Sequence, residues 1–217
     1  YFFNFINQGV LMNILKKIFF VSFISLSSLS FAEVSLSGNV ALTTDYVWRG
    51  MTQNDGDPSI SGGFDLEDDS GFYLGVWAAN VSGGTSSLEL DGYLGYSGSF
   101  NEDSGYDIGF IAYTYPDNTS DLDFEELYLT IDFYGVYVMY ANGIDTATNY
   151  GEVGYSVDAG PGSFSISYGD YEDVGKNYLV GYEYPVGDFT LGFFYSDFNS
   201  DSGPSGDQDG GFFTISY

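Results

Sequence analysis

Residues 126–133 read ELYLTIDF. Every second residue from Leu127 to Phe133 is apolar, and the residues between them carry polar groups. Because successive side chains of a β-strand point to opposite faces, this run predicts a strand with one apolar and one polar face. The period of two therefore decides the fold class: the chain builds sheets.

The same alternation recurs along most of the chain. It is clear in the runs 34–49, 60–67, 88–94, 164–168, 178–184 and 189–195, and weaker at 72–81, 106–115 and 136–141. Turn residues separate the runs at 68–71, 103–105, 134–135, 160–162 and 185–188. These short turns alternate with longer polar stretches at 50–58, 82–86, 116–121, 142–148, 172–176 and 199–210.

Short turns on one side and longer loops on the other are typical of bacterial outer-membrane barrels. We therefore predict an all-β protein, an antiparallel transmembrane up-and-down β-barrel over residues 33–217. The runs indicate about twelve strands, with ten or fourteen left open by the weaker ones.

The N-terminal segment is predicted to lie outside the barrel. From Met12 onward, two lysines precede an apolar run, which ends in Ser30-Phe31-Ala32. That order is typical of a cleaved secretory signal peptide, here residues 12–32. Residues 1–11 precede a suitable start methionine, and we interpret them as upstream sequence that is not native.

Composition restricts the partners. The whole chain has 31 acidic and 4 basic side chains, a net charge of −27. Past residue 32 the only basic residues are Arg49 and Lys176. Such a surface repels nucleic acid, which is held mainly by basic side chains, and it attracts small cations.

The residue inventory also argues against catalysis. The chain contains no Cys and no His, which removes the usual zinc ligands and the common catalytic triads. We predict no enzyme activity, no cofactor and no metal, although the acidic turns at 54–58 and 207–210 suit calcium in their residue types.

The chain ends on residues 211–217, GFFTISY, an alternating strand that closes on an aromatic residue. Bacterial outer-membrane barrels commonly end in this way. We expect the barrel-assembly machinery to read the strand ending at Tyr217, and we expect outer-membrane lipids and lipopolysaccharide to surround the apolar face. The predicted location is the bacterial outer membrane.

Several blocks of sequence resemble one protein family. Residues 45–58 read DYVWRGMTQNDGDP, followed by GGFD at 62–65 and GFYLGVWAANV at 71–81. Together with ELDGYLGY at 89–96, YTYP at 113–116 and EELYL at 125–129, they resemble the TorF-type porins. The resemblance is strongest over residues 38–133. It implies a porin-like barrel, and supplies no substrate and no catalytic residue.

The polar faces supply the candidate site. If the apolar faces meet lipid, the interior receives the pore-lining candidates Asp45, Arg49, Asp65, Glu67, Glu89, Asp91, Glu126, Asp132, Glu152 and Glu183. Carboxylates around a pore favour cations. Arg49 is either a selectivity residue at the outer end of the first strand or a structural bridge to carboxylates, with its partner on an adjacent strand.

Two functions follow from this pattern. The first is a porin, a passive cation-favouring channel for small solutes. The alternative is a closed, non-conducting structural or adhesion barrel, with Trp77, Tyr93, Tyr113 and Phe194 filling the interior. A further set of aromatic residues suits an interfacial girdle in the membrane: Tyr46, Trp48, Tyr113, Tyr115, Tyr182 and Tyr184.

Overall fold

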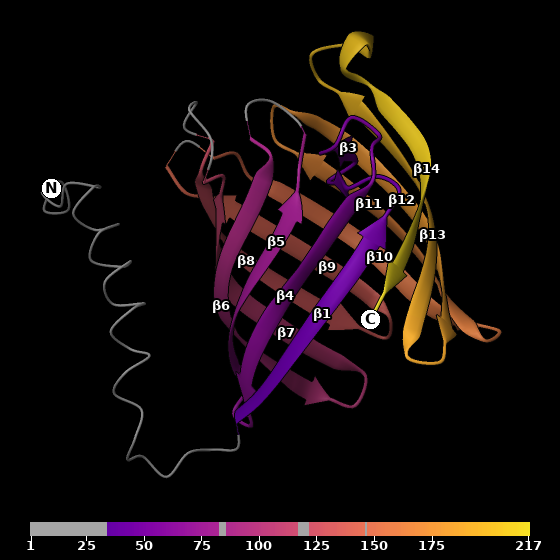
Figure 1. The fold of residues 1–217 in the computed structure, drawn as a ribbon. Helices are drawn as coiled ribbons and strands as arrows, with labels where there is room; N and C mark the ends of the chain where they lie inside the picture. The colour runs from indigo at the N-terminus through magenta and orange to yellow at the C-terminus, as the bar shows by residue number, and fades with distance from the viewer. Residues whose placement is uncertain (1–33, 83–85, 117–121, 146) are drawn as a thin grey trace, which may run out of the picture. The chain divides into compact units, whose positions relative to one another are not determined.

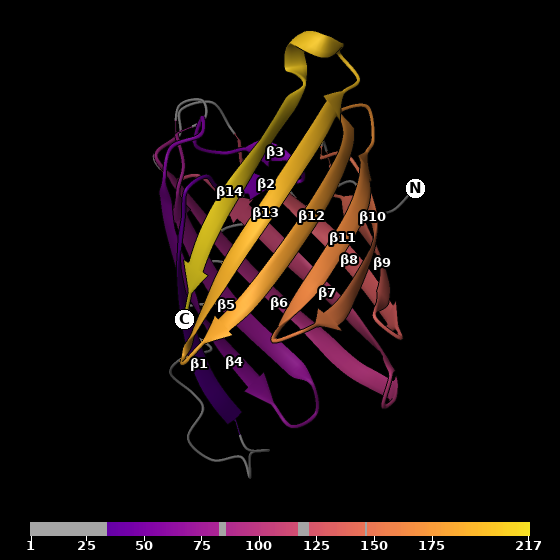
Figure 2. The ribbon, with the colours of Figure 1, turned by 90° about the vertical axis from the view of Figure 1, so that its right-hand side faces the viewer.

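The computed structural model describes residues 34–82, 86–116, 122–145 and 147–217. Within these residues twelve antiparallel strands pair in a closed ring, shown in Figures 1 and 2. The predicted fold, an antiparallel barrel of about twelve strands, is confirmed. The upstream segment 1–11 and the predicted signal peptide 12–32 lie outside the described residues.

The barrel strands follow one another around the ring in chain order. They are β1 (Val34–Thr43), β4 (Ser59–Asp68), β5 (Phe72–Asn80), β6 (Leu88–Asn101), β7 (Ser104–Thr114), β8 (Phe124–Phe133), β9 (Val136–Gly143), β10 (Tyr150–Ala159), β11 (Gly162–Tyr171), β12 (Gly175–Val186), β13 (Phe189–Ser200) and β14 (Gln208–Ser216). The runs of weak alternation are strands as well, namely β5, β7 and β9. A short 3₁₀ turn, Pro204–Gly206, precedes β14.

The apolar face of each strand points away from the barrel interior. On β8, Leu127 and Ile131 are about half exposed, at 52% and 47%. The opposite face points inward, because the hydroxyl groups of Tyr73 on β5 and Tyr128 on β8 share a hydrogen bond although two strands separate them. The outer surface is thus apolar, and the interior is lined by the polar face.

The two ends of the barrel differ. At one end, which we call the turn end, tight connections join β4 to β5, β6 to β7, β8 to β9, β10 to β11 and β12 to β13. The opposite end is the loop end. Buried apolar side chains gather at the loop end: Ala79, Val81, Tyr113, Ala141, Tyr150 and Phe198. The core of the protein therefore lies inside one end of the barrel.

The first strand is shorter than its alternation predicts. β1 ends at Thr43, whose hydroxyl donates a 2.7 Å hydrogen bond to the carbonyl of Asp45. The chain then forms a small hairpin from β2 (Val47–Trp48) and β3 (Met51–Thr52), which pair only with each other among the described residues. The expectation that Arg49 ends the first strand is wrong, since the alternation continues while the chain leaves the barrel wall.

The seam that closes the barrel is short. β1 and β14 are in register only over Ala41–Thr43 and Thr214–Ser216. Backbone hydrogen bonds extend the seam by one step at each end, with two between Val40 and Tyr217 (3.1 and 2.9 Å) and one from the N–H of Thr44 to the carbonyl of Phe213 (2.9 Å). Among the described residues, the segment 34–39 of β1 pairs with β4 alone.

Candidate pore interior

The hairpin at residues 45–53, which we call the inward hairpin, turns at Arg49 and Gly50. Their φ angles are +48° and +84°, as a two-residue hairpin turn with positive φ at both positions requires. Glycine occupies the second position without strain. Apolar residues flank this turn, Trp48 before it and Met51 after it, and Trp48 packs against aromatic residues of the barrel wall.

Arg49 forms a two-fold ion pair with Glu126 on β8. The Nη1 and Nη2 groups of Arg49 each donate a hydrogen bond of 2.7 Å, to Oε1 and Oε2 of Glu126 respectively. The side chains are 7% and 1% exposed. Burial alone would lower the pKa of Arg49, but the hydrogen bonds and charge of Glu126 raise it above its ordinary value. The pair is therefore ionised and almost dry.

The position of Glu126 corrects a prediction. We expected the partner of Arg49 on a strand adjacent to β1, and β8 lies nearly opposite β1 in the ring. The inward hairpin makes this contact possible because it carries Arg49 across the interior. The ion pair therefore ties two distant parts of the wall together.

Aromatic rings enclose the guanidinium group. Its central carbon lies 4.2 Å from the ring centre of Trp48, 4.1 Å from that of Tyr150 and 4.9 Å from that of Tyr171. These distances are within the range of cation–π attraction, which is stronger where water is excluded. Trp48 in turn contacts Tyr113, Phe124 and Tyr171, with ring centres 5.7, 6.1 and 5.8 Å away.

The tip and edge of the inward hairpin reach the remaining wall. A Cβ atom on Gly50 would lie 2.6 Å from Cβ of Asn177 on β12 and 3.0 Å from Cβ of Phe198 on β13. The backbone N–H of Thr52 donates a 2.9 Å hydrogen bond to Gln208 on β14. The hairpin therefore contacts the wall on most of its circumference and narrows the interior at the loop end.

Tyr46 fixes the base of the inward hairpin against a pair of carboxylates on β6. Its hydroxyl donates a 2.7 Å hydrogen bond to Glu89, which also accepts one of 2.6 Å from Tyr115. Burial, and then the charge of Glu89, raises the pKa of Tyr46 above its ordinary value, so the phenol stays a neutral donor. Asp91 lies two residues further along the same face of β6, and Glu89 and Asp91 are only 2% and 4% exposed.

The other predicted pore-lining residues lie at different depths. Asp45 accepts a 2.6 Å hydrogen bond from Thr52 within the hairpin. Asp65 on β4 accepts a hydrogen bond from the hydroxyl of Tyr93. Glu152 on β10 accepts hydrogen bonds of 2.6 Å from Tyr137 and from Tyr150.

Asp132 lines a separate cavity, described below. Glu67 and Glu183 are exposed near the turn end. The structure therefore brings Arg49, Glu89, Asp91 and Glu126 together around the inward hairpin and leaves the other candidates apart.

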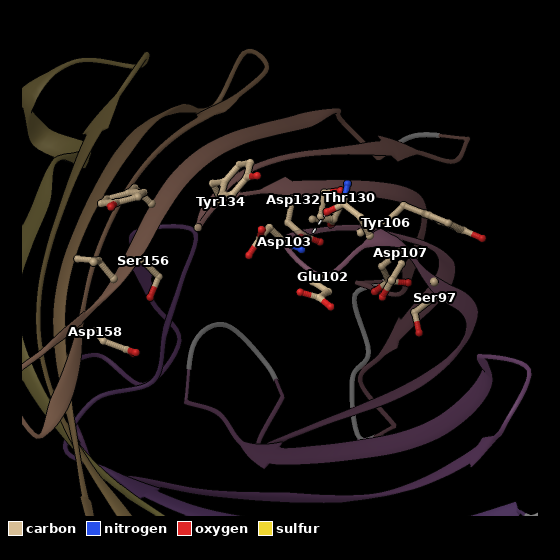
Figure 3. A pocket seen from close by; sticks show the side chains of 18 residues that line it. Ser97, Glu102, Asp103, Tyr106, Asp107, Thr130, Asp132, Tyr134, Ser156 and Asp158 are labelled. Carbon is tan, nitrogen blue, oxygen red and sulfur yellow. Dashed lines mark hydrogen bonds between the residues drawn. The ribbon is translucent and has the colours of Figure 1, made fainter.

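An acidic cavity of about 740 Å³ opens at the turn end. Figure 3 shows Asp107 and Asp158 on opposite sides of this cavity, with Glu102 and Asp103 between them. Asp132 also lines it. The turn-end half of the interior is thus open and acidic, and the loop-end half, which the inward hairpin narrows, is drier.

Sequence reasoning misplaced several aromatic residues. Tyr46, Trp48 and Tyr115 were expected in an interfacial girdle, but they surround the hairpin and Glu89 inside the barrel. Tyr113, for which both a girdle and an interior position were predicted, lies inside the barrel against Trp48. The tyrosine donors Tyr73, Tyr128 and Tyr137 were not singled out. A signal was present, because Tyr128 stands on the polar face of the run 126–133.

No helix among the described residues is long and apolar enough to span a membrane. No three His, Cys, Asp or Glu side chains in the described part of the chain are grouped so as to hold a metal ion.

The closed ring of twelve antiparallel strands places this protein among barrels of the porin fold. Among solved structures it is similar to the KdgM porin in complex with disordered oligogalacturonate, with a TM-score of 0.61 and 9% identity over 84% of this chain and 98% of that one. OccAB2 of Acinetobacter baumannii is also similar, with a TM-score of 0.44 and 10% identity over 88% and 65% of the two chains.

Sequence comparison identifies the family. Residues 30–191 match the family described as "Bacterial protein of unknown function (Gcw_chp)", and the chain belongs to it. No curated protein matches the chain in sequence.

Proposed function

We propose that this protein is an outer-membrane porin of the TorF type, a passive channel for small solutes that favours cations. One observation carries the proposal: a closed barrel with an apolar outer face encloses an interior lined with carboxylates. Closing the sheet into a ring pairs the backbone groups of the strands with one another over most of the wall, which suits a membrane. Excess negative charge along a pore attracts cations and repels anions.

The partners of the barrel are part of this proposal. The apolar belt would contact outer-membrane lipids and lipopolysaccharide, and the assembly machinery would read the strand that ends at Tyr217. The solved KdgM porin is in complex with an oligogalacturonate, a sugar chain with a carboxylate on each unit. The acidic cavity of this chain disfavours such a polyanion, so we expect small cationic or neutral solutes instead.

A second function is favoured by the inward hairpin, which packs against most of the wall. A barrel whose hairpin seals the interior would conduct nothing and would serve as a structural or adhesion barrel. The choice depends on whether the hairpin narrows the interior or seals it.

Bilayer recording separates the two functions. The protein, refolded and inserted into a planar bilayer, is expected to show discrete conductance steps. Its reversal potential in a KCl gradient should have the sign of cation preference, with K⁺ several-fold more permeant than Cl⁻, and added oligogalacturonate should not block the steps. Anion preference would contradict the role of the carboxylates, and silence from inserted, folded protein would establish the closed barrel.

A further inference from the structure

The buried charges around the inward hairpin do not balance. Glu89, Asp91 and Glu126 bring three carboxylates into the dry region, and Arg49 supplies one positive charge, which Glu126 already binds through both oxygens. The only other basic residue among the described residues, Lys176, is exposed and lies near Asp170 and Asp201. Within this part of the chain, Glu89 and Asp91 therefore have no cation beside them.

The two carboxylates are not equivalent. In Glu89 each carboxylate oxygen accepts a hydrogen bond from a tyrosine hydroxyl. Asp91 is 4% exposed, and its Oδ1 atom has no hydrogen-bond partner in the described part of the chain. A buried ionised carboxylate without a partner is costly, and such groups take up a proton instead.

The described residues around Asp91 offer no positive charge to balance its carboxylate. On β6 itself the charged or titratable neighbours are Glu89 and Tyr93. Across the interface the titratable neighbours are three phenols: Tyr46 of the inward hairpin, and Tyr113 and Tyr115 at the end of β7. On β5 the residue opposite Asp91 is Trp77, which carries no charge.

We propose that Asp91 binds a proton when the inward hairpin docks and releases it when the hairpin leaves, so that Glu89 and Asp91 form an acid-sensitive lock on the interior. The docked state binds one proton more than the released state, in which water reaches Asp91. Linkage then requires docking to weaken as pH rises. The effect on conductance rests on the proposed channel function, whereas the docking equilibrium does not.

A single tryptophan reports the docking. The chain has two tryptophans. Trp48 lies on the hairpin, and the Trp77→Phe variant leaves it as the sole emitter while keeping a ring against Tyr46. In vesicles, raising the pH from about 5 to about 9, a span that covers buried carboxyl groups, should shift Trp48 emission reversibly to longer wavelength as water reaches the ring. Asp91→Asn, which mimics the protonated acid, should hold the emission at short wavelength throughout.

The control is Asp158→Asn, in the cavity at the other end of the barrel, which should keep the pH-dependent shift. The lock would be overturned if the Asp91→Asn protein showed a pH-dependent emission shift as large as that of the Trp77→Phe parent. It would also be overturned if the emission of that parent did not change with pH. A shift driven by millimolar Ca²⁺ at fixed pH and lost in Asp91→Asn would assign the site to a metal ion instead. Silent bilayers combined with the expected emission shifts would overturn the channel while leaving the lock intact.

Discussion

Replacing Arg49 by alanine is expected to release the inward hairpin and raise the single-channel conductance several-fold. The substitution leaves Glu126 buried without its counter-charge. Removing one partner of a buried ion pair costs about 3–5 kcal/mol, which shifts an equilibrium by a factor of about 100 or more. Loss of the cation–π contacts to Tyr150 and Tyr171 adds to the effect.

The measurement combines bilayer conductance with Trp48 emission in the Trp77→Phe background. The matched control is Lys176→Ala, since Lys176 forms only exposed ion pairs of 3.9 and 4.0 Å and exposed pairs contribute little. The Arg49→Ala, Glu126→Ala double variant should recover part of the docking, because it removes the stranded carboxylate. Native conductance and emission in the Arg49→Ala protein would show that the ion pair does not hold the hairpin.

Replacing Gly50 by alanine is expected to undock the hairpin by a different route. The added Cβ would lie 2.6 Å from Cβ of Asn177, closer than such atoms approach, and the φ of +84° is unfavourable for any residue with a side chain. The backbone part costs about 1–2 kcal/mol, and the overlap adds to it. We expect increased conductance and Trp48 emission at longer wavelength.

Gly56→Ala separates the two causes. Gly56 has nearly the same φ, +81°, but nothing lies within 4 Å of the Cβ position. The Gly56→Ala variant therefore has the backbone strain of a positive φ without the steric overlap of the added Cβ atom. The inward hairpin should stay mostly docked in this variant. Equal effects of the two substitutions would mean that the tip does not pack tightly against β12 and β13.

Much of the fold was predictable because alternate residues of a strand face different environments, so apolar and polar residues alternate in the sequence. The run 126–133 and the final strand to Tyr217 have one face in each environment, so their pattern is strong. The inward hairpin was missed because the alternation of residues 34–43 continues through Trp48 and Arg49. A period of two specifies faces and does not reveal where the chain leaves the wall.

The site was harder to predict, because it depends on contacts between distant residues. Glu126 and Arg49 lie 77 positions apart, and no local pattern connects them. The signal that was available is the Arg49-Gly50 step between apolar residues, which is the composition of a tight hairpin turn. The aromatic residues were misplaced for a related reason, since Tyr and Trp suit both a lipid interface and a packed interior.

The short seam between β1 and β14 has a consequence for the order of folding. All the other pairs in the ring join barrel strands that follow one another along the chain. These hairpins therefore form from local segments. The seam joins opposite ends of the chain through a few residues, and closing so long a loop has a high entropic cost and slows the step. We therefore expect a late intermediate, a curled open sheet with two free edges, which becomes a barrel only after β14 has paired with β1.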